Sequence, residues 1–246
     1  MDAAAMVRNN IIPIETNEWG LDDLPLLRDL DENEMNLVKS NAVNKIYKKR
    51  INIYREGSRH AGVYILLNGI VKIYKIGSKG KQHILRFAQR GDIIAYRSLL
   101  SNELACSSAK AHDDNVIVSY VPHHIFLELL HRNRNFTQAI MKMICRELYD
   151  SNAIVTDFAQ KRLRERTAKI LLLLKKEFGV DFYNTLQIQV TRMDLANMIG
   201  TVTESLIRVL SEFRDEGLLD LSHKNIVFLD IQKLHRIANF SQYNHF

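Results

Sequence analysis

The sequence predicts an α+β protein with an N-terminal β-roll, a long helix and a compact C-terminal domain. Three observations predict it: short apolar runs broken by glycine turns, an apolar stripe with steps of three and four, and two short helices followed by a hairpin pattern. The expected boundaries are an extension over residues 1–20, the roll over 21–134, the long helix over 135–160 and the C-terminal domain over 161–246.

The N-terminal part divides into two segments. Residues 1–19 show no clear periodicity, so we expect an extension without regular structure. Residues 21–43 carry many acidic positions and are interpreted as short helices.

Residues 45–121 are interpreted as short strands, because glycine turns interrupt their apolar runs at the spacing of a small barrel or jelly roll. Asn68-Gly69 is the strongest hairpin signal, since this pair readily adopts the positive φ angles of a tight turn. We therefore expect residues 63–67 to pair with residues 70–76. Further turns are expected at Gly57, residues 77–80 and Gly91-Asp92.

The long helix is predicted from a stripe at Ile140, Ile144, Leu148, Val155 and Phe158, with Ser151 at the missing seam position. This pattern is typical of a short coiled coil between two copies of the chain. A helix buried against its own β-roll is the alternative. The basic cluster that follows, at Lys161, Arg162, Arg164 and Arg166, is compatible with phosphate contacts, although we expect a solvated face.

Residues 191–199 predict a short helix. Thr191 with Asp194 three residues on is a variant of the capping box, and apolar residues follow at helical spacing. Gly200 ends this helix, because glycine adopts the left-handed conformation that turns the chain into the next helix.

A second helix follows, and we expect Thr201 and Glu204 to open it as cap residues. Its apolar stripe consists of Leu206, Val209, Leu210 and Phe213. This stripe leaves outward-facing candidate base readers at Thr203, Glu204, Ile207, Arg208 and Ser211. Gly217 closes the helix.

Residues 218–221 are expected to pair with residues 226–229 across the polar tip Ser222, His223, Lys224 and Asn225. Two helices around a glycine, followed by such a hairpin, are the order of a winged helix-turn-helix, which favours DNA binding. Glu204 and Arg208 also fit an ordinary i,i+4 ion pair, and Glu204 fits a cap without any base contact.

The Glu-x-x-x-Arg pattern of the second helix resembles the cyclic AMP receptor protein and fumarate-nitrate reductase regulator superfamily. The resemblance implies that Glu204 and Arg208 reach the major groove, where a carboxylate accepts from cytosine N4 and a guanidinium donates to guanine O6 and N7. It assigns phosphate contacts to Arg192 and Ser205, and the wing position suggests the same role for Lys224.

Two positions depart from the family. Thr203 stands where the cyclic AMP receptor has arginine, so we expect a different half-site. Ile207 stands where family members usually carry a small residue, and it either touches a thymine methyl or packs.

The stretch VYILLNGIVKIYK, with the later Gly91-Asp92 turn, resembles the cyclic-nucleotide-binding domain of the same superfamily. Members that bind cyclic AMP follow this turn with a glutamate and an Arg-Ser pair, but Tyr96 and Ala105-Cys106 stand there instead. We therefore expect no cyclic AMP binding. Arg97-Ser98 is an out-of-place Arg-Ser pair that fits either an anion site or a solvated surface.

The resemblance also implies a dimer, because the corresponding helix of the superfamily dimerises and its polar residues contact the effector. Ser151 and Asn152 match those polar positions. We favour the dimer for a physical reason as well, since one recognition helix reads too few base pairs to discriminate a site in a genome. RNA polymerase is a further expected partner.

The composition of the chain limits which partners and cofactors are expected. The net charge of +6 makes an anionic partner plausible, but residues 161–246 hold 13 Lys and Arg against 10 Asp and Glu, so the charge is not concentrated there. Two cysteines, Cys106 and Cys145, form no ligand series, so no iron-sulfur cluster is expected. Haem stays open, with candidate axial ligands His60, His83, His112, His123, His124 and His131, although ordinary surface histidines are favoured.

Two functions from different classes were weighed. The first is a cytoplasmic homodimeric transcription regulator that binds double-stranded DNA, has no membrane segment and responds to an unknown small-molecule effector. The second is a nucleotide-binding regulatory subunit of an enzyme, whose C-terminal domain mediates protein contacts. The chain lacks GxGxxG, GxxxxGK[ST], GxSxG and HExxH motifs, which disfavours an enzyme.

Overall fold

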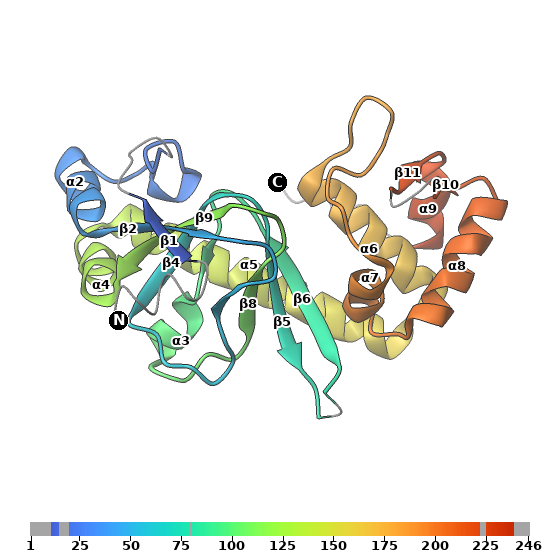
Figure 1. Ribbon diagram of the computed structural model, residues 1–246, viewed down its shortest axis with the longest axis horizontal. Coiled ribbons are helices and arrows are strands. Elements are labelled where there is room, and N and C mark those ends of the chain that lie inside the picture. The colour runs from blue at the N-terminus through green and yellow to red at the C-terminus, as the bar shows by residue number, and fades with distance from the viewer. Residues whose placement is uncertain (1–10, 15–19, 79, 222–224, 239–246) are drawn as a thin grey trace. The chain divides into compact units, whose positions relative to one another are not determined.

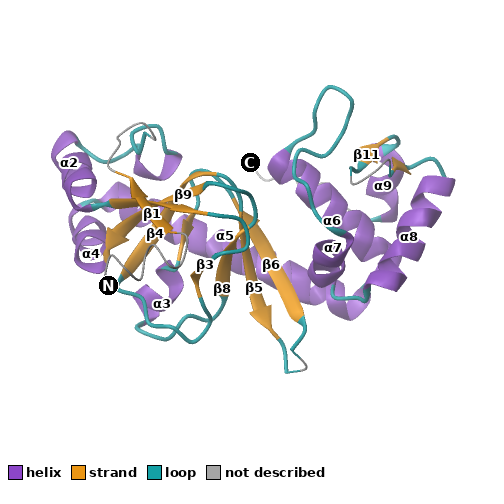
Figure 2. Cartoon of the chain, viewed as in Figure 1, coloured by secondary structure: helices purple, strands orange, loops and turns teal. Residues whose placement is uncertain are grey.

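The computed structural model describes residues 11–14, 20–78, 80–221 and 225–238. It divides into a strand-rich unit, Met1–Leu148, and a mainly helical unit, Tyr149–Phe246 (Figure 1, Figure 2). Among the described residues, no helix is both long enough and apolar enough to cross a bilayer.

The strand-rich unit is a roll of two antiparallel sheets, as the sequence predicts. The five-stranded sheet has the order β1 (Ile11–Ile14), β2 (Val43–Tyr47), β9 (Val116–Pro122), β4 (Gly62–Asn68) and β7 (Ile93–Ile94). The four-stranded sheet has the order β3 (Asn52–Tyr54), β8 (Ser108–Ala111), β5 (Val71–Ile76) and β6 (Gln82–Ala88).

Strand β1 corrects the expectation that the N-terminal extension has no regular structure. It pairs with β2 in antiparallel register, from Ile11 opposite Tyr47 to Ile14 opposite Asn44. Pairing with an existing sheet edge supplies the hydrogen bonds of so short a strand. Four residues are too few to show a periodicity of their own, so the pattern did not reveal this strand.

Strand β4 explains the long apolar run of the roll, because it is buried on both faces. Val63, Ile65 and Leu67 face a core between the five-stranded sheet and the surrounding helices. Leu66 faces a second core, which lies between the two sheets and includes Ile73. Successive side chains of a strand point to opposite faces, and here both faces are buried. The apolar run is therefore continuous in the sequence.

The predicted hairpin at Asn68-Gly69 is wrong. Strand β4 pairs with β9 and β7, whereas β5 pairs with β6 and β8, so the two strands belong to different sheets. Gly69 does have the expected positive φ of 79°. A Cβ at this position would lie 3.2 Å from the Cα of Val116. The turn therefore carries the chain closely past β9 from one sheet to the other, and the hairpin is β5–β6.

Helices cover the five-stranded sheet. They are η1 (Pro25–Leu27), α2 (Glu32–Asn41), α3 (Tyr96–Ser101), α4 (His123–Arg132) and the start of α5 (Arg134–Gln160). The short acidic helices expected between residues 21 and 43 are therefore confirmed as η1 and α2. Asp31 and Glu34 form a full capping box at the start of α2, which accounts for two of the acidic side chains.

Helix α5 is the predicted long helix, but two of its predicted seam residues lie elsewhere. Phe158 is half-buried, with its ring against Gly200 and under the Arg166 guanidinium, so its assignment to the seam is wrong. Ile140 is buried in the core of the roll together with Phe136. Met141, Ile144, Leu148 and Val155 are exposed. The assignment of Ile140 to the seam is therefore wrong, because the beginning of α5 packs into the core of the roll. Met141, the next residue, has the spacing that continues the exposed stripe.

The helical unit contains the predicted two helices and hairpin. Its elements are α6 (Leu163–Phe178), α7 (Arg192–Ile199), α8 (Thr203–Asp215), β10 (Leu219–Asp220), β11 (Val227–Phe228) and α9 (Ile231–Ile237). Leu171, Leu172 and Leu174 are buried, which confirms that the leucine run of α6 is a core feature.

Gly200 separates α7 from α8 with φ 75° and ψ 43°, in the left-handed region expected from the sequence. A Cβ built on it would lie 2.5 Å from Cε1 of Phe158, the ring near the end of α5. Glycine is thus required twice, for its backbone conformation and for the approach of this ring.

We predict that Gly200→Ala lowers the free energy of unfolding by about 2 to 4 kcal/mol. The alanine side chain would strain the left-handed backbone and would also clash with the Phe158 ring. Gly217→Ala is the matched control. Gly217 also has a positive φ, 70°, but nothing lies within 4 Å of its Cβ position, so only about 1 to 2 kcal/mol is expected. Denaturant unfolding of both variants measures the difference, and equal losses would contradict the role of the Phe158 contact.

Candidate DNA-binding surface and sensing cluster

Helix α7 is fixed by its first and last residues. The Thr191 hydroxyl accepts a hydrogen bond from the Asp194 amide at 3.0 Å, as the capping pattern predicts. Leu195 and Ile199 are buried, and Gly200 then turns the chain. The start of α7 is therefore held in place, with Arg192 as its first helical residue.

Helix α8 begins later than the sequence suggests. Its N-cap is Val202, which makes no side-chain capping bond, and Thr203 is its first residue. The expected capping pair of Thr201 with Glu204 is therefore wrong, because the left-handed turn at Gly200 delays helical conformation beyond Thr201. Glu204 lies in the first turn, where a carboxylate interacts favourably with the helix dipole.

The predicted stripe of α8 is confirmed, since Leu206, Val209, Leu210 and Phe213 are all buried. The opposite face carries the predicted readers. Glu204, Ile207 and Arg208 are exposed, and Thr203, Ser205 and Ser211 are half-buried. The sequence therefore assigned the faces of this helix correctly.

Glu204 and Arg208 do not form the ordinary ion pair that the spacing allows. Within the described part of the chain, the ion pairs of α8 involve Glu212, Arg214 and the following Glu216, and none joins Glu204 to Arg208. Both side chains are exposed, so one carboxylate and one guanidinium face solvent one helical turn apart. This pair can accept a hydrogen bond at one base and donate two at another.

Arg192 differs from these exposed groups because its guanidinium is half-buried. Its Nη1 atom is enclosed but has no hydrogen-bond partner among the described residues. Burial lowers the pKa of this guanidinium, since the charged form loses solvation without gaining an anion. Such a group favours an external anion as its partner.

The wing is partly described. Leu219 pairs with Phe228 and Asp220 with Val227 in the β10–β11 ladder, which matches the predicted hairpin register. Ser222, His223 and Lys224 lie outside the described residues, so the predicted phosphate contact of Lys224 stays a prediction.

The basic cluster after α5 is not the solvated face expected from sequence. Arg164 pairs with Glu212 at 3.1 Å and with Glu216 at 2.6 Å. Its guanidinium also lies over the Phe213 ring, 4.8 Å from the centroid. Lys161 pairs with Asp157 at 3.2 Å. Arg164 therefore connects α6 to α8 and to the residue that follows it, whereas the Lys161 pair is local and Arg162 is exposed.

Two of the predicted effector residues, Tyr96 and Arg97, lie in a polar cluster of the strand-rich unit, which we call the sensing cluster. Tyr96 is buried at the start of α3, and its hydroxyl donates to the Glu147 carboxylate on α5. Arg97 pairs with the same carboxylate through Nε, 3.1 Å from Oε2. Arg97 therefore lies on a helix rather than in a loop, and its exposed side chain forms an ion pair with Glu147.

Arg86 and Asp92 complete this cluster. Arg86 on β6 lies 3.1 Å from Oε1 of Glu147 and 3.2 Å from Oδ2 of Asp92. Burial raises the pKa of the Glu147 carboxyl, but Arg86, Tyr96 and Arg97 outweigh it and hold that pKa below its ordinary value. Burial and the bond to Glu147 raise the pKa of Tyr96 to about 12. Sequence reasoning missed both Arg86 and Glu147, because neither stands at a family motif.

Ser98 does not join Arg97 in an anion site. Its buried hydroxyl donates to the Ala95 carbonyl at 3.2 Å, within the first turn of α3. Ser151 and Asn152 are exposed on α5, and the Asn152 carbonyl accepts from the Thr156 hydroxyl at 3.0 Å. Their predicted effector contact stays a prediction.

Of the histidines considered for haem, His112 is buried beside the Phe87 ring, with the ring centroids 5.0 Å apart, whereas His60 is half-buried. The His60 ring is 4.6 Å from the Tyr54 ring, and its buried Nε2 has no partner among the described residues. Burial lowers its pKa. His123 and His124 are exposed at the start of α4. None of these positions tests haem binding, for which the sequence favours ordinary surface histidines.

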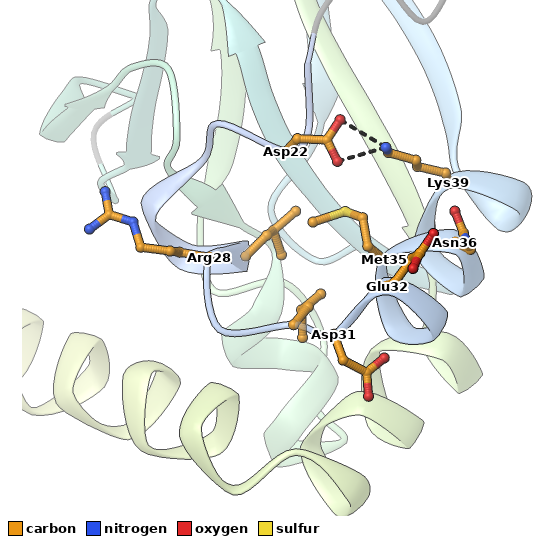
Figure 3. Close-up of a pocket in the computed structure, with 9 residues that line it drawn as sticks. Asp22, Arg28, Asp31, Glu32, Met35, Asn36 and Lys39 are labelled. Carbon is orange, nitrogen blue, oxygen red and sulfur yellow. Dashed lines mark hydrogen bonds and ion pairs between the residues drawn. The ribbon is translucent and has the colours of Figure 1, made fainter.

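A surface hollow of about 360 Å³ lies in the strand-rich unit, between η1 and α2, and none of its lining residues belongs to the sensing cluster (Figure 3). The ion pair of Asp22 with Lys39, at 2.6 Å, spans it. Asp31, another lining residue, caps α2. These charged groups already have partners that join two helical segments, so the hollow is not the candidate effector site. No group of three or more metal-ligating side chains occurs in the described ranges.

Comparison with known proteins identifies two domains in the chain. Residues 44–133 match the cyclic nucleotide-binding domain, and residues 165–237 match the Crp-like helix-turn-helix domain. The chain belongs to the CRP/FNR superfamily of transcription regulators. It is accordingly a regulator with a sensing domain of the cyclic-nucleotide-binding type and a helix-turn-helix DNA-binding domain.

Relatives of the chain span most of its length. Electron transport regulator A of Shewanella oneidensis is 24% identical over 196 residues, 79% of this chain and 78% of that protein. The fumarate and nitrate reduction regulatory protein of Vibrio cholerae is 22% identical over 243 residues, 98% of this chain and 96% of that one. The structure of FixK2 from Bradyrhizobium japonicum matches with a TM-score of 0.70 and 25% identity, covering 80% of this chain and 96% of that one.

We predict that cyclic AMP does not raise the melting temperature of this regulator. The carboxylate of Glu147 already pairs with Arg86 and Arg97, and Tyr96 stands where the family has its ribose-binding glutamate. A ligand that binds only the folded state must raise apparent stability, so thermal unfolding with and without the nucleotide is decisive. A cyclic AMP-binding family member is the positive control, and a clear rise for this chain would contradict the prediction.

Proposed function

We propose that this regulator acts as a homodimer that reads a two-fold symmetric operator through the major groove with helix α8. One observation carries the proposal. Glu204 and Arg208 are exposed on a helix that follows a left-handed glycine turn, and they are not paired with each other. Two readers without an ion-pair partner among the described residues favour an external partner with both acceptor and donor groups, which base edges provide.

The roles of the readers follow from their chemistry. The Glu204 carboxylate accepts from cytosine N4, and the Arg208 guanidinium donates to guanine O6 and N7. Ile207 is 47% exposed between them, which favours contact with a thymine methyl over internal burial. Thr203, at the start of α8, has too short a side chain to replace the arginine of the receptor, so the operator differs from the receptor's site.

Phosphate contacts position α8 rather than read sequence. Arg192 is the strongest candidate, because its enclosed Nη1 has no partner in the described chain and a phosphate oxygen would supply one. Ser205 is half-buried on the first turn of α8, where a hydroxyl and the helix N-terminus both favour an anion. Lys224 contributes a third contact from the wing.

Dimerisation is supported by the exposed face of α5. Met141, Ile144, Leu148 and Val155 recur at steps of three, four and seven, and Ser151 fills the gap. Leu148 is 61% exposed and Val155 is 67% exposed, so this stripe is not covered by the chain's own β-roll. A second copy of α5 would bury it as a coiled coil.

Beyond these contacts, we propose a cytoplasmic regulator without catalytic activity, iron-sulfur cluster or membrane attachment. Its effector is either an unknown small molecule other than cyclic AMP or none. RNA polymerase is the expected protein partner. A surface suited to it lies between α6 and α7, where Phe182 is 94% exposed and Tyr183 is 75% exposed. The Asp181 carboxylate holds their turn by accepting from the Tyr183 and Thr185 amides, each at 2.8 Å.

Selection of bound duplexes from a random pool tests the proposal. We expect a two-fold symmetric site, with binding that weakens steeply as salt is added, because phosphate contacts release counterions. Recovery of no preferred duplex, with or without a metabolite extract, would leave the alternative of a regulatory subunit that mediates protein contacts.

We predict that Glu204→Ala and Arg208→Ala each weaken specific binding by about 1 to 3 kcal/mol and relax discrimination at one base pair. Arg214→Ala is the matched control, since Arg214 is exposed on the same helix but pairs with Asp215 at 2.8 Å. Competition binding on single-base operator variants measures both effects. A uniform loss on every sequence would instead indicate a phosphate contact.

Leu148→Asp is expected to convert the dimer to a monomer at micromolar concentration, because a carboxylate in an apolar seam is desolvated without a partner. Operator affinity should fall about tenfold or more, since two half-sites are no longer bound together. Tyr149→Asp is the control, because Tyr149 is 54% exposed but lies beside the seam. Light scattering gives the oligomeric state, and a Leu148→Asp dimer would refute the seam.

Phe182→Ala with Tyr183→Ala is expected to reduce transcription activation several-fold while leaving operator affinity unchanged, because the turn is distant in sequence from α8. Asn184, in the same turn, has a positive φ of 58°, so Asn184→Gly is a control that preserves the backbone. In vitro transcription and operator binding are measured together. A loss of DNA binding would place the aromatic pair at the DNA instead.

A further inference from the structure

The sensing cluster brings three donors to one carboxylate of the same chain. Arg86 on β6, with Tyr96 and Arg97 on α3, all contact the Glu147 side chain. Glu147 itself comes from α5, so three elements meet at its two oxygens. The side chain is only 18% exposed, which makes this an enclosed arrangement rather than a surface ion pair.

The charges identify the group that this arrangement binds. Arg86 and Arg97 supply two positive charges, while Asp92 neutralises one through its 3.2 Å contact with Arg86. Without Glu147, one uncompensated positive charge and a phenol donor would remain. Two guanidinium groups and a hydroxyl that converge on two oxygens are the donors that a carboxylate requires.

We propose that Arg86, Tyr96 and Arg97 form a carboxylate-binding site whose ligand is Glu147, so that the sensing domain carries its own anion. The middle of α5 is then fixed to the β-roll without an external effector. Glu147 is a positioning residue in this scheme, because it acts through the placement of α5. Only the consequence for operator binding rests on the proposed function; binding of the carboxylate stands independently of it.

The site also has a consequence for external ligands. An anionic ligand that reaches Arg97 must displace Glu147, since the same guanidinium atoms contact its carboxylate. Removal of the Glu147 carboxylate should therefore open the site to a small carboxylate. Acetate is the matched probe, because it reproduces the two carbons that a glutamate-to-alanine substitution removes beyond Cβ.

The first experiment compares native protein, Glu147→Ala and Glu128→Ala by thermal unfolding in sodium acetate and in sodium chloride of equal ionic strength. Glu128 is the matched control, because it pairs with Arg132 at 2.7 Å on the outside of α4. We expect 100 mM acetate to raise the melting temperature of Glu147→Ala by about 3 °C relative to chloride, as a site with a Kd of about 10 mM would. Native protein and Glu128→Ala should show no difference between the salts.

Two results would overturn the proposal. One is a folded Glu147→Ala that gains no stability from acetate. The other is equal stabilisation of the native protein, which would mean that Glu147 does not occupy the site in solution.

A double-mutant cycle keeps the test decisive if Glu147→Ala does not fold. Glu147→Gln preserves the side-chain volume, and Arg97 is 52% exposed, so its removal leaves no large cavity. Arg97→Ala should lower the denaturant midpoint in the native background and have little effect in the Glu147→Gln background. Equal losses in both backgrounds would show that Arg97 does not act through the carboxylate.

Operator binding separates this proposal from the proposed function. Native protein should bind its selected duplex without any small molecule, and Glu147→Ala should bind about tenfold more weakly until acetate is added. Acetate that stabilises Glu147→Ala but does not restore its affinity would refute the coupling to DNA binding. If the native protein binds no duplex, the proposed function fails, while the thermal measurements still decide whether the carboxylate site exists.

Discussion

The DNA-binding unit depends on one constraint, the left-handed backbone at Gly200 against the ring of Phe158. The φ of 75° ends α7, and the missing Cβ lets the aromatic ring approach where a side chain would collide. Phe158 belongs to α5, so this contact also fixes the end of α5 to the turn between α7 and α8. The direction of α8, and with it the face that carries Glu204 and Arg208, follows from this arrangement.

The second constraint is that successive parts of α5 make different contacts. Phe136 and Ile140 are buried in the β-roll, Glu147 binds the sensing cluster, and Leu148 and Val155 remain exposed. One helix therefore serves a core, an ion-pair cluster and an apolar seam along its length. A change in the ion-pair cluster would act on the same helix that carries the exposed stripe, which would give sensing and the proposed dimerisation a common physical element.

Much of the fold and the DNA-binding face follows from local sequence, because the signals there are local. The Thr191 cap, the Gly200 turn and the stripe of Leu206 and Phe213 each involve residues within a few positions of one another. The errors arose where distant partners decide. Asn68-Gly69 has the chemistry of a hairpin turn, but both edges of β4 are taken by β7 and β9. Likewise, the spacing of Ile140 fits the seam, but the β-roll buries it.

The sensing cluster was the least predictable part, because its charged groups come together only through the fold. Arg86 and Glu147 are 61 positions apart in the numbering, and neither follows a motif, yet their side chains lie 3.1 Å apart. The sequence indicates that the family's anion-binding residues are missing, but it does not indicate that an internal carboxylate pairs with Arg86, Tyr96 and Arg97. A buried carboxylate is costly without partners, whereas here two guanidinium groups and a phenol offset its loss of solvation. The net charge of the chain therefore says little about the charge of the sensing cluster. The cations there are already neutralised by acidic residues of the same chain.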